Sequence, residues 1–436
     1  MTINLRAALA IAALSLVSAA PAAHAQETLT LDEAILRAQQ RSARIEEIDA
    51  RRAVAAAAES GRAAARMPAV SLLAGYTRTN HVEEFSVFAP GQGPQVIYPD
   101  VPDNFRSRVD LQWPIYTGGR TEAMMRAASS ETRAAGEDVQ SARADLRLEV
   151  TRAFWALATA REAERVVARA LENLEAHVRD LRSRLEQGLI PPNDVTFAEA
   201  RRSHQRLLSI EATNLRGIAE ADLRRLVGGE GPIAPAAVLE TIAAVQAPPG
   251  GVVAIVAGAE RRALNFRLDA SRAREQAIRA TAKPQISFGG GYDFARPNPR
   301  IFPRVDAWED SWDASVNLSW SLWDGGRRRA EQAEASSSTR AVQARLTEFE
   351  RQLAFELQQR ELELDSARSA IDASADGVRS AAETRRVVAE RYSAGVVTST
   401  DVLDAEVALL QAELDRTRAL SAAALAEARL ERARVR

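Results

Sequence analysis

The sequence predicts an α+β membrane protein made of two internal repeats, each with two membrane strands and a very long coiled-coil helix. Three observations predict this fold class. The chain of 436 residues opens with a secretory signal, its motifs recur at a fixed offset, and strand patterns occur only in two short regions between helical segments.

Residues 1–25 have the features of a secretory signal peptide. Arg6 supplies the positive charge, Ala7 to Val17 form the apolar stretch, and Ala23-His24-Ala25 is an A-x-A cleavage motif. After this segment no run approaches the ~18 apolar residues that a membrane-spanning helix needs. A location in a membrane would therefore require strands closed into a barrel.

Composition excludes several classes of function. The chain has no cysteine, so it has no disulfide, thiolate metal site or cysteine nucleophile, and its net charge of −2 argues against nucleic-acid binding. Its four histidines show no ligand spacing, and no acid–base or nucleophilic constellation is present. We therefore expect no enzyme activity, no metal and no cofactor.

The chain contains two copies of one pattern. Motifs recur 207 residues later: Gly118-Gly119-Arg120 as Gly325-Gly326-Arg327, Gly188 as Gly395, and Asp194-Val195 as Asp401-Val402. We expect repeat 1 over residues 26–229 and repeat 2 over residues 259–436. The proline- and glycine-rich segment 230–258 is predicted to link them as an equatorial belt.

Each repeat is expected to contain a helix, two strands, a very long helix, a tight turn and a further helix. The first helix begins at a capping box, Thr30 followed by Glu33, and is expected to run to about Arg66. The long helix, from about Gly119 to Gln187, has apolar residues at alternating three- and four-residue spacing, which is a coiled-coil seam. Its length of roughly 100 Å predicts a wall of helices and not a compact core.

Strands are predicted at about 69–79, 106–116, 284–294 and 311–322. Each alternates an apolar face with a polar face, as membrane-barrel strands do, although a soluble sandwich shows the same alternation. The signal peptide and the long helices favour the membrane. Four strands are too few for a membrane barrel, which needs about eight or more, so several chains must share one.

Tryptophans 113, 312 and 320 suit the membrane interface, with core packing as the alternative. The proline-rich segments between the strands of each pair, 80–105 and 295–311, are expected to be irregular extracellular turns.

The chain resembles the TolC-like outer-membrane efflux channels, or outer-membrane factors. The resemblance spans nearly the whole mature chain. It rests on Leu29-Thr30-Leu31-Asp32-Glu33-Ala34-Ile35, on the joints Tyr116-Thr117-Gly118-Gly119-Arg120 and Leu322-Trp323-Asp324-Gly325-Gly326-Arg327, and on both hairpin tips, above all Arg391-Tyr392-Ser393-Ala394-Gly395-Val396 with Thr400-Asp401-Val402-Leu403-Asp404-Ala405.

The resemblance implies a homotrimer in the outer membrane of a Gram-negative bacterium, with a shared twelve-stranded transmembrane β-barrel and a twelve-helix periplasmic tunnel. It further implies a periplasmic adaptor (membrane fusion) protein and an inner-membrane pump as partners. The chain departs from the family at Ser42-Ala43, where members often have Asn-Pro, at Asn265-Phe266-Arg267-Leu268, and at Val397, where some carry a basic residue.

The expected function is a passive exit duct of a tripartite efflux or type I secretion system. The alternative is a periplasmic coiled-coil adaptor or structural protein, which would explain the heptads but not the paired strands or the duplicated tips. An outer-membrane enzyme with a helical appendage is a third reading, and it lacks a recognisable site. The sequence does not identify the exported cargo.

Two acids are candidates for the periplasmic aperture. In the family, acids at the positions of Asp401 and Asp404 surround the narrowest periplasmic opening, where clustered carboxylates favour cations. The alternative is a helix-start role for Asp401, and equally for Asp194, as an N-cap. Asp194 and Tyr392 are expected to hydrogen-bond between helices in the closed state, with a tyrosine packed in a seam as the alternative.

The remaining candidates are glycines and the residues that follow them. Gly188 and Gly395 are expected to end the long helices in a left-handed conformation. The tips, Gly188 with Leu189 and Gly395 with Val396, are the expected docking surface for the adaptor. The strand-to-helix bends are expected at four glycines: Gly118, Gly119, Gly325 and Gly326. Because Pro191-Pro192 stiffens the first tip, we expect the second hairpin to move more on opening.

Overall fold

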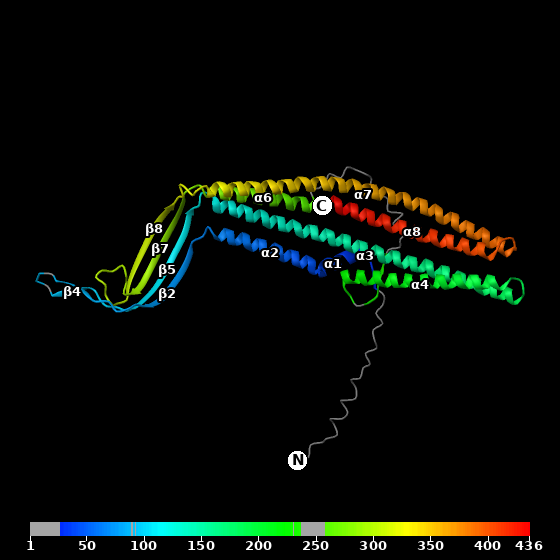
Figure 1. The fold of residues 1–436 in the computed structure, drawn as a ribbon, viewed down its shortest axis with the longest axis horizontal. Coiled ribbons are helices and arrows are strands. Elements are labelled where there is room, and N and C mark those ends of the chain that lie inside the picture. Colours follow the sequence, from blue (N-terminus) through cyan, green and yellow to red (C-terminus); the bar gives the residue numbers. More distant parts are fainter. Residues whose placement is uncertain (1–26, 89, 92, 230, 237–257) are drawn as a thin grey trace, which may run out of the picture. The chain divides into compact units, whose positions relative to one another are not determined.

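The computed structural model describes residues 27–88, 90–91, 93–229, 231–236 and 258–436 (Figure 1). The predicted signal peptide and most of the predicted linker 230–258 lie outside the described residues. The helices are α1 (Leu31–Arg41), α2 (Ala43–Ala64), α3 (Arg120–Glu186), α4 (Pro192–Val227), α6 (Ala259–Ala280), α7 (Arg327–Ser393) and α8 (Ser399–Arg434). The strands are β1 (Glu27–Leu29), β2 (Ala69–Arg78), β3 (Phe85–Phe88), β4 (Pro94–Tyr98), β5 (Asp103–Tyr116), β6 (Ile233–Pro235), β7 (Gln285–Arg296) and β8 (Glu309–Ser319).

The chain divides into two compact units, and each unit draws on both repeats. The first holds the described residues of Met1–Ser42, Arg143–Ala254 and Glu356–Arg434; the second holds those of Ala43–Ala142, Ile255–Phe355 and Val435–Arg436. The hairpin tips therefore belong to the first unit, and the sheet belongs to the second. None of the helices in the described ranges combines the length and the apolar character needed to cross a membrane.

The internal repeat is reproduced in the lengths of the elements. Helices α3 and α7 each contain 67 residues, and α4 and α8 each contain 36. Helices α2 and α6 each contain 22 residues. The same sequence pattern thus produces the same local structure twice.

The first helical segment differs from its prediction. It begins at the expected capping box, since the Thr30 hydroxyl accepts from the Glu33 N–H at 3.3 Å and the Glu33 carboxylate accepts from the Thr30 N–H at 2.9 Å. It does not continue unbroken to Arg66. Ser42 adopts an extended conformation, with ψ of 109°, and separates α1 from α2. An extended residue interrupts the i to i−4 hydrogen-bond series, so the helix restarts at Ala43.

The second unit contains an antiparallel four-stranded sheet of order β2-β5-β7-β8, and Figure 1 shows these strands side by side. The central pair, β5 and β7, joins the two repeats. One side of the sheet is apolar. Its central row consists of cross-strand neighbours from all four strands: Leu72, Val109, Tyr292 and Trp312. Arg108 and its partner Asp293 lie on the other, polar side.

The strands and the connecting segments also depart from the predicted bounds. Strand β8 ends at Ser319, so Trp320 and Leu322 lie beyond it. The segment 80–105 was expected to be irregular, but it contains the β3–β4 hairpin, in which Phe85 pairs with Tyr98. Pro94 is tolerated because it is the first residue of β4, where it pairs with Phe88, so the hairpin forms in a segment whose composition suggests an irregular turn.

Candidate functional site

The two helix-hairpin tips of the first unit have the same backbone conformation. Gly188 and Gly395 both have positive φ, 71° and 74°, directly after the long helices. The Leu189 N–H donates to Arg184 C=O and the Val396 N–H donates to Arg391 C=O, both at 2.9 Å. These are the six-to-one bonds of Schellman motifs, which require a left-handed residue that glycine supplies without a steric penalty. Leu189 and Val396 are left 67% and 62% exposed at the tips.

The helices that follow the tips begin differently. Helix α8 starts at a capping box: the Thr398 N–H and hydroxyl donate to the Asp401 carboxylate at 2.8 and 2.7 Å, and the Asp401 N–H donates back to Thr398 at 3.3 Å. These bonds hold the pKa of Asp401 below its usual range. Helix α4 starts at Pro192, and its N-cap residue Pro191 makes no side-chain cap. Asp401 and Asp194 are therefore the third residues of the first helical turn and not N-caps, because Thr398 and Pro191 occupy the cap position.

A buried apolar cluster holds the second hairpin against the first. Its fully buried members are Val178, Leu181, Val195, Ala198 and Leu403, of which only Leu403 comes from α8. Tyr392 of α7 packs against the same cluster. The contact between the hairpins thus depends on few side chains from the second one.

Tyr392 lies in this contact with its hydroxyl unsatisfied. The His177 ring lies edge-on to it, with centroids 5.6 Å apart, and the Arg184 guanidinium lies 4.9 Å from its ring centroid. Within the described residues its buried hydroxyl oxygen has no hydrogen-bond partner. Burial raises the pKa of this hydroxyl. No hydrogen bond joins Tyr392 to Asp194 among the described residues of one chain, and the closed-state hydrogen bonding of these two residues between neighbouring helices stays a prediction.

His177 joins the hairpins by a polar contact. Its Nε2 lies 2.9 Å from the buried hydroxyl of Ser399 at the start of α8. Burial lowers the pKa of His177, against the opposing fields of Asp180 and Glu406. Sequence reasoning missed this residue because its partner lies 222 positions away.

Asp404 also lies at the contact between hairpins. Its carboxylate is 65% exposed and lies 3.7 Å from Arg201 of α4, a weak exposed ion pair. Asp401 and Asp404 thus lie in the first two turns of α8, and both reach solvent.

The strand-to-helix bends lie in the second unit. The four predicted glycines have positive φ: Gly118 at 68°, Gly119 at 91°, Gly325 at 67° and Gly326 at 93°. Near each bend an indole N–H donates to a backbone carbonyl just beyond the end of α2 or α6. Trp113 donates to Arg66 C=O and Trp320 donates to Ala282 C=O, both at 3.1 Å. Trp113 thus ties β5, and Trp320 ties the segment after β8, to the helical segments of the same unit.

The chain matches the family described as outer membrane efflux protein over residues 23–229 and 260–434. The chain belongs to this family. It is 26% identical to protein CyaE of Bordetella pertussis over 314 residues, which cover 68% of this chain and 64% of CyaE. The match thus spans slightly less than two thirds of its relative's length.

Two solved structures share the fold of this chain. The transmembrane-channel protein CusC superposes with a TM-score of 0.81 at 17% identity, covering 94% of this chain and 93% of CusC. The Campylobacter jejuni outer membrane channel CmeC superposes with a TM-score of 0.79 at 16% identity, covering 93% of this chain and 85% of CmeC. Both confirm the predicted fold class, and the family confirms the predicted resemblance and the outer-membrane location.

The structure brings some predicted site residues together and separates others. The predicted residues Tyr392 and Asp404 lie at one contact between the hairpins, together with Leu403 and His177, for which no site role was predicted. The glycines of the bends belong to the other unit. Among the described residues no group of three or more His, Asp or Glu side chains is placed to hold a metal ion.

Proposed function

We propose that this efflux protein is a passive exit duct in which three copies share one barrel. The observation that carries the proposal is the sheet of the second unit. Its edge strands β2 and β8 pair on one side only within the described residues, and its apolar face exposes Val70, Leu72, Trp312, Val316 and Leu318 by 67–73%. An open sheet with such a face is unstable in water and requires both lipid and further strands.

Edge-to-edge pairing of copies satisfies both requirements. Four strands per copy close a barrel only when several copies combine, and three copies supply twelve strands. The apolar face then contacts lipid, and the polar face lines the lumen. The protein carries no catalytic step of its own in this proposal, and its partner pump supplies the energy.

The tips are proposed to form the periplasmic aperture. Three copies bring three Asp401 and three Asp404 carboxylates toward one axis, where they favour cations. An adaptor is proposed to dock on the exposed apolar side chains of Leu189 and Val396 and to move the second hairpin. The cargo belongs to the class that the partner pump selects.

The native mass of the processed protein, extracted in detergent from purified outer membranes, tests the assembly. We expect a mass near three mature chains and a conducting pore in planar bilayers. A monomer found free in the periplasm would contradict the shared barrel and would favour the coiled-coil adaptor.

The aperture is tested separately by charge removal. The double variant Asp401→Asn, Asp404→Asn should lose cation preference, measured as the reversal potential in a KCl gradient. Asp415→Asn on the same helix is the matched control, since its carboxylate is 51% exposed and lies more than two turns further along α8. Equal reversal potentials for both variants would remove the aperture role of these acids.

A further inference from the structure

The polar face of the sheet carries an ion-pair network centred on Arg108. Its guanidinium contacts Asp293 of β7, Asp110 of its own strand at 2.7 Å, and Asp313 of β8 at 3.0 Å. Gly291 permits this position, because a Cβ there would overlap the Arg108 guanidinium. Asp293 is only 2% exposed, so its charge is desolvated and must be compensated by its partners.

Two further arginines complete the network. Arg106 donates from Nε to Asp293 at 2.6 Å, and Arg300 lies 2.9 Å from Asp313. Arg106, Arg108 and Arg300 thus share three aspartates, and the network is formally neutral. Arg106 remains 53% exposed, and its described polar contact is made by Nε alone, so its terminal nitrogens can donate elsewhere.

Arg304 adds a positive charge that no carboxylate of the described residues contacts. It lies on the segment between β7 and β8, where it donates to the Tyr98 hydroxyl at 2.6 Å and lies 5.0 Å from that ring centroid. The segment is held in place by Asn298, which is 2% exposed and donates to Glu309 C=O at 3.0 Å and to the Ser311 hydroxyl at 3.1 Å. Arg304 is thereby fixed near the polar face.

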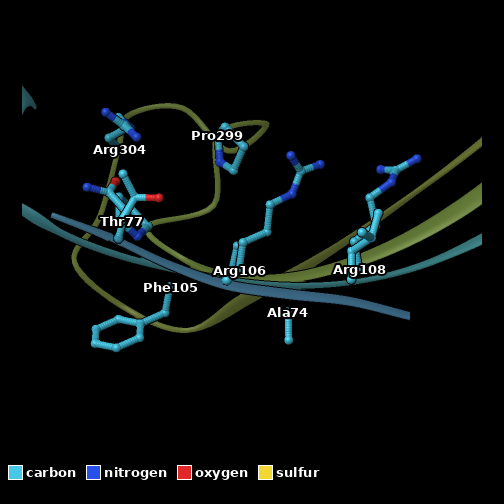
Figure 2. A pocket seen from close by; sticks show the side chains of 12 residues that line it. Ala74, Thr77, Phe105, Arg106, Arg108, Pro299 and Arg304 are labelled. Atoms are coloured by element: carbon cyan, nitrogen blue, oxygen red, sulfur yellow. The ribbon is translucent and has the colours of Figure 1, made fainter. Parts of the chain in front are cut away.

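A cavity of about 400 Å³ lies between this segment and the sheet. Figure 2 shows Arg106 and Arg108 rising from the same side of the sheet as Pro299 and Arg304, while Phe105 and Ala74 point to the opposite side. Among the described residues that line the cavity, three are arginines and none is acidic. Glu309 lies on the same face by strand alternation, but it is not part of the lining.

We propose that this cavity is a binding site for an oxyanion, which Arg106 and Arg304 hold. Guanidinium groups recognise carboxylates and phosphates through paired, charge-assisted hydrogen bonds, and arginines lining a pore favour anions. The fixed positions of both arginines reduce the ordering cost of binding. The inference rests on the proposed function in one respect, namely that the polar face lines the lumen.

Inorganic phosphate at pH 8 is the probe, applied to the full-length processed protein in planar bilayers in KCl. We expect phosphate to reduce the chloride current of the wild type, and the double variant Arg106→Gln, Arg304→Gln to weaken this block about tenfold, because charge-assisted bonds are lost. Asp293 keeps Arg108 as a partner in this variant. If the double variant does not assemble, Arg304→Gln alone, which loses a neutral hydroxyl partner, should weaken the block.

The matched control is Arg78→Gln. Arg78 donates to Asp103 at 3.4 Å beside Tyr76, which donates to the same carboxylate, so both lie on the opposite face of the sheet. This variant should keep the wild-type block. A conducting wild type that phosphate does not block, or equal block in all variants, overturns the inference. A wild type that forms no pore instead overturns the proposed function.

Discussion

The two hairpin tips have the same backbone conformation but differ in how the next helix begins. Both long helices end in a glycine with positive φ and a Schellman bond. The first tip then relies on Pro191 and Pro192, whose rings restrict φ, whereas the second relies on three hydrogen bonds between Thr398 and Asp401. The proline rings restrain the backbone of the first tip covalently, whereas the hydrogen bonds of the second tip can break and re-form. The prediction that the second tip rearranges more on opening is consistent with this difference.

Packing shows the same asymmetry. In the first hairpin, Val178 and Leu181 of α3 pack on Val195 and Ala198 of α4. At the equivalent position of Val178 the second hairpin has Arg385, which pairs with Glu406 at 2.7 Å. The second hairpin therefore contributes mainly Leu403 and Tyr392 to the apolar contact. The first hairpin is internally packed, and the second rests on it.

The largest effect is expected from Leu403→Ala. Removing this side chain, which is 3% exposed, should weaken the contact between the hairpins by roughly 2–5 kcal/mol, because it leaves a cavity in the cluster. Single-channel recording should show a higher open probability. Val407→Ala, one turn further along and 49% exposed, is the control and should behave as wild type. Similar recordings for the two variants would mean that Leu403 does not hold the hairpins together.

An intermediate effect is expected from Thr398→Ala. Losing the capping box should destabilise the start of α8 by about 1 kcal/mol and increase opening moderately. Pro191→Ala in the first tip removes no side-chain hydrogen bond, so its effect should be smaller. Hydrogen exchange of the first turns of α4 and α8 measures both changes. Greater exchange in the proline variant would contradict the asymmetry proposed between the tips.

The smallest effect is expected from pH. Burial lowers the pKa of His177 from its ordinary value of 6.5, so the folded contact holds fewer protons than the open form. The neutral His177 therefore contributes its full stabilisation of the contact between the hairpins above pH 6.5. This stabilisation is lost as the pH falls toward the lowered pKa of His177. Asp180 and Glu406 oppose the shift and Arg184 adds to it. Conductance should rise modestly between pH 7 and pH 5.

His177→Gln is the variant that isolates this pH response. Glutamine can still hydrogen-bond to Ser399 but does not titrate, so the pH dependence of conductance should flatten while conductance at pH 7 stays near that of the wild type. An unchanged slope would assign the response to another group.

The repeat, the strand faces and the tip glycines could be predicted because each depends on local rules. A glycine after a long helix specifies a Schellman end, and a period of two specifies which residues share a face of a strand. For this reason Gly188, Gly395 and the alternation around Val109 and Trp312 could be read from the sequence. The break at Ser42 could not, because neither proline nor glycine marks it.

What the sequence determined by itself was therefore the family, the order of elements and the apolar face of the sheet. Tertiary structure decided which distant residues meet. It paired β5 with β7, placed Arg108 of the first repeat on Asp293 of the second, and set His177 beside Ser399. Such contacts depend on strand order and helix packing, which follow from the burial of many side chains at once and not from any local pattern.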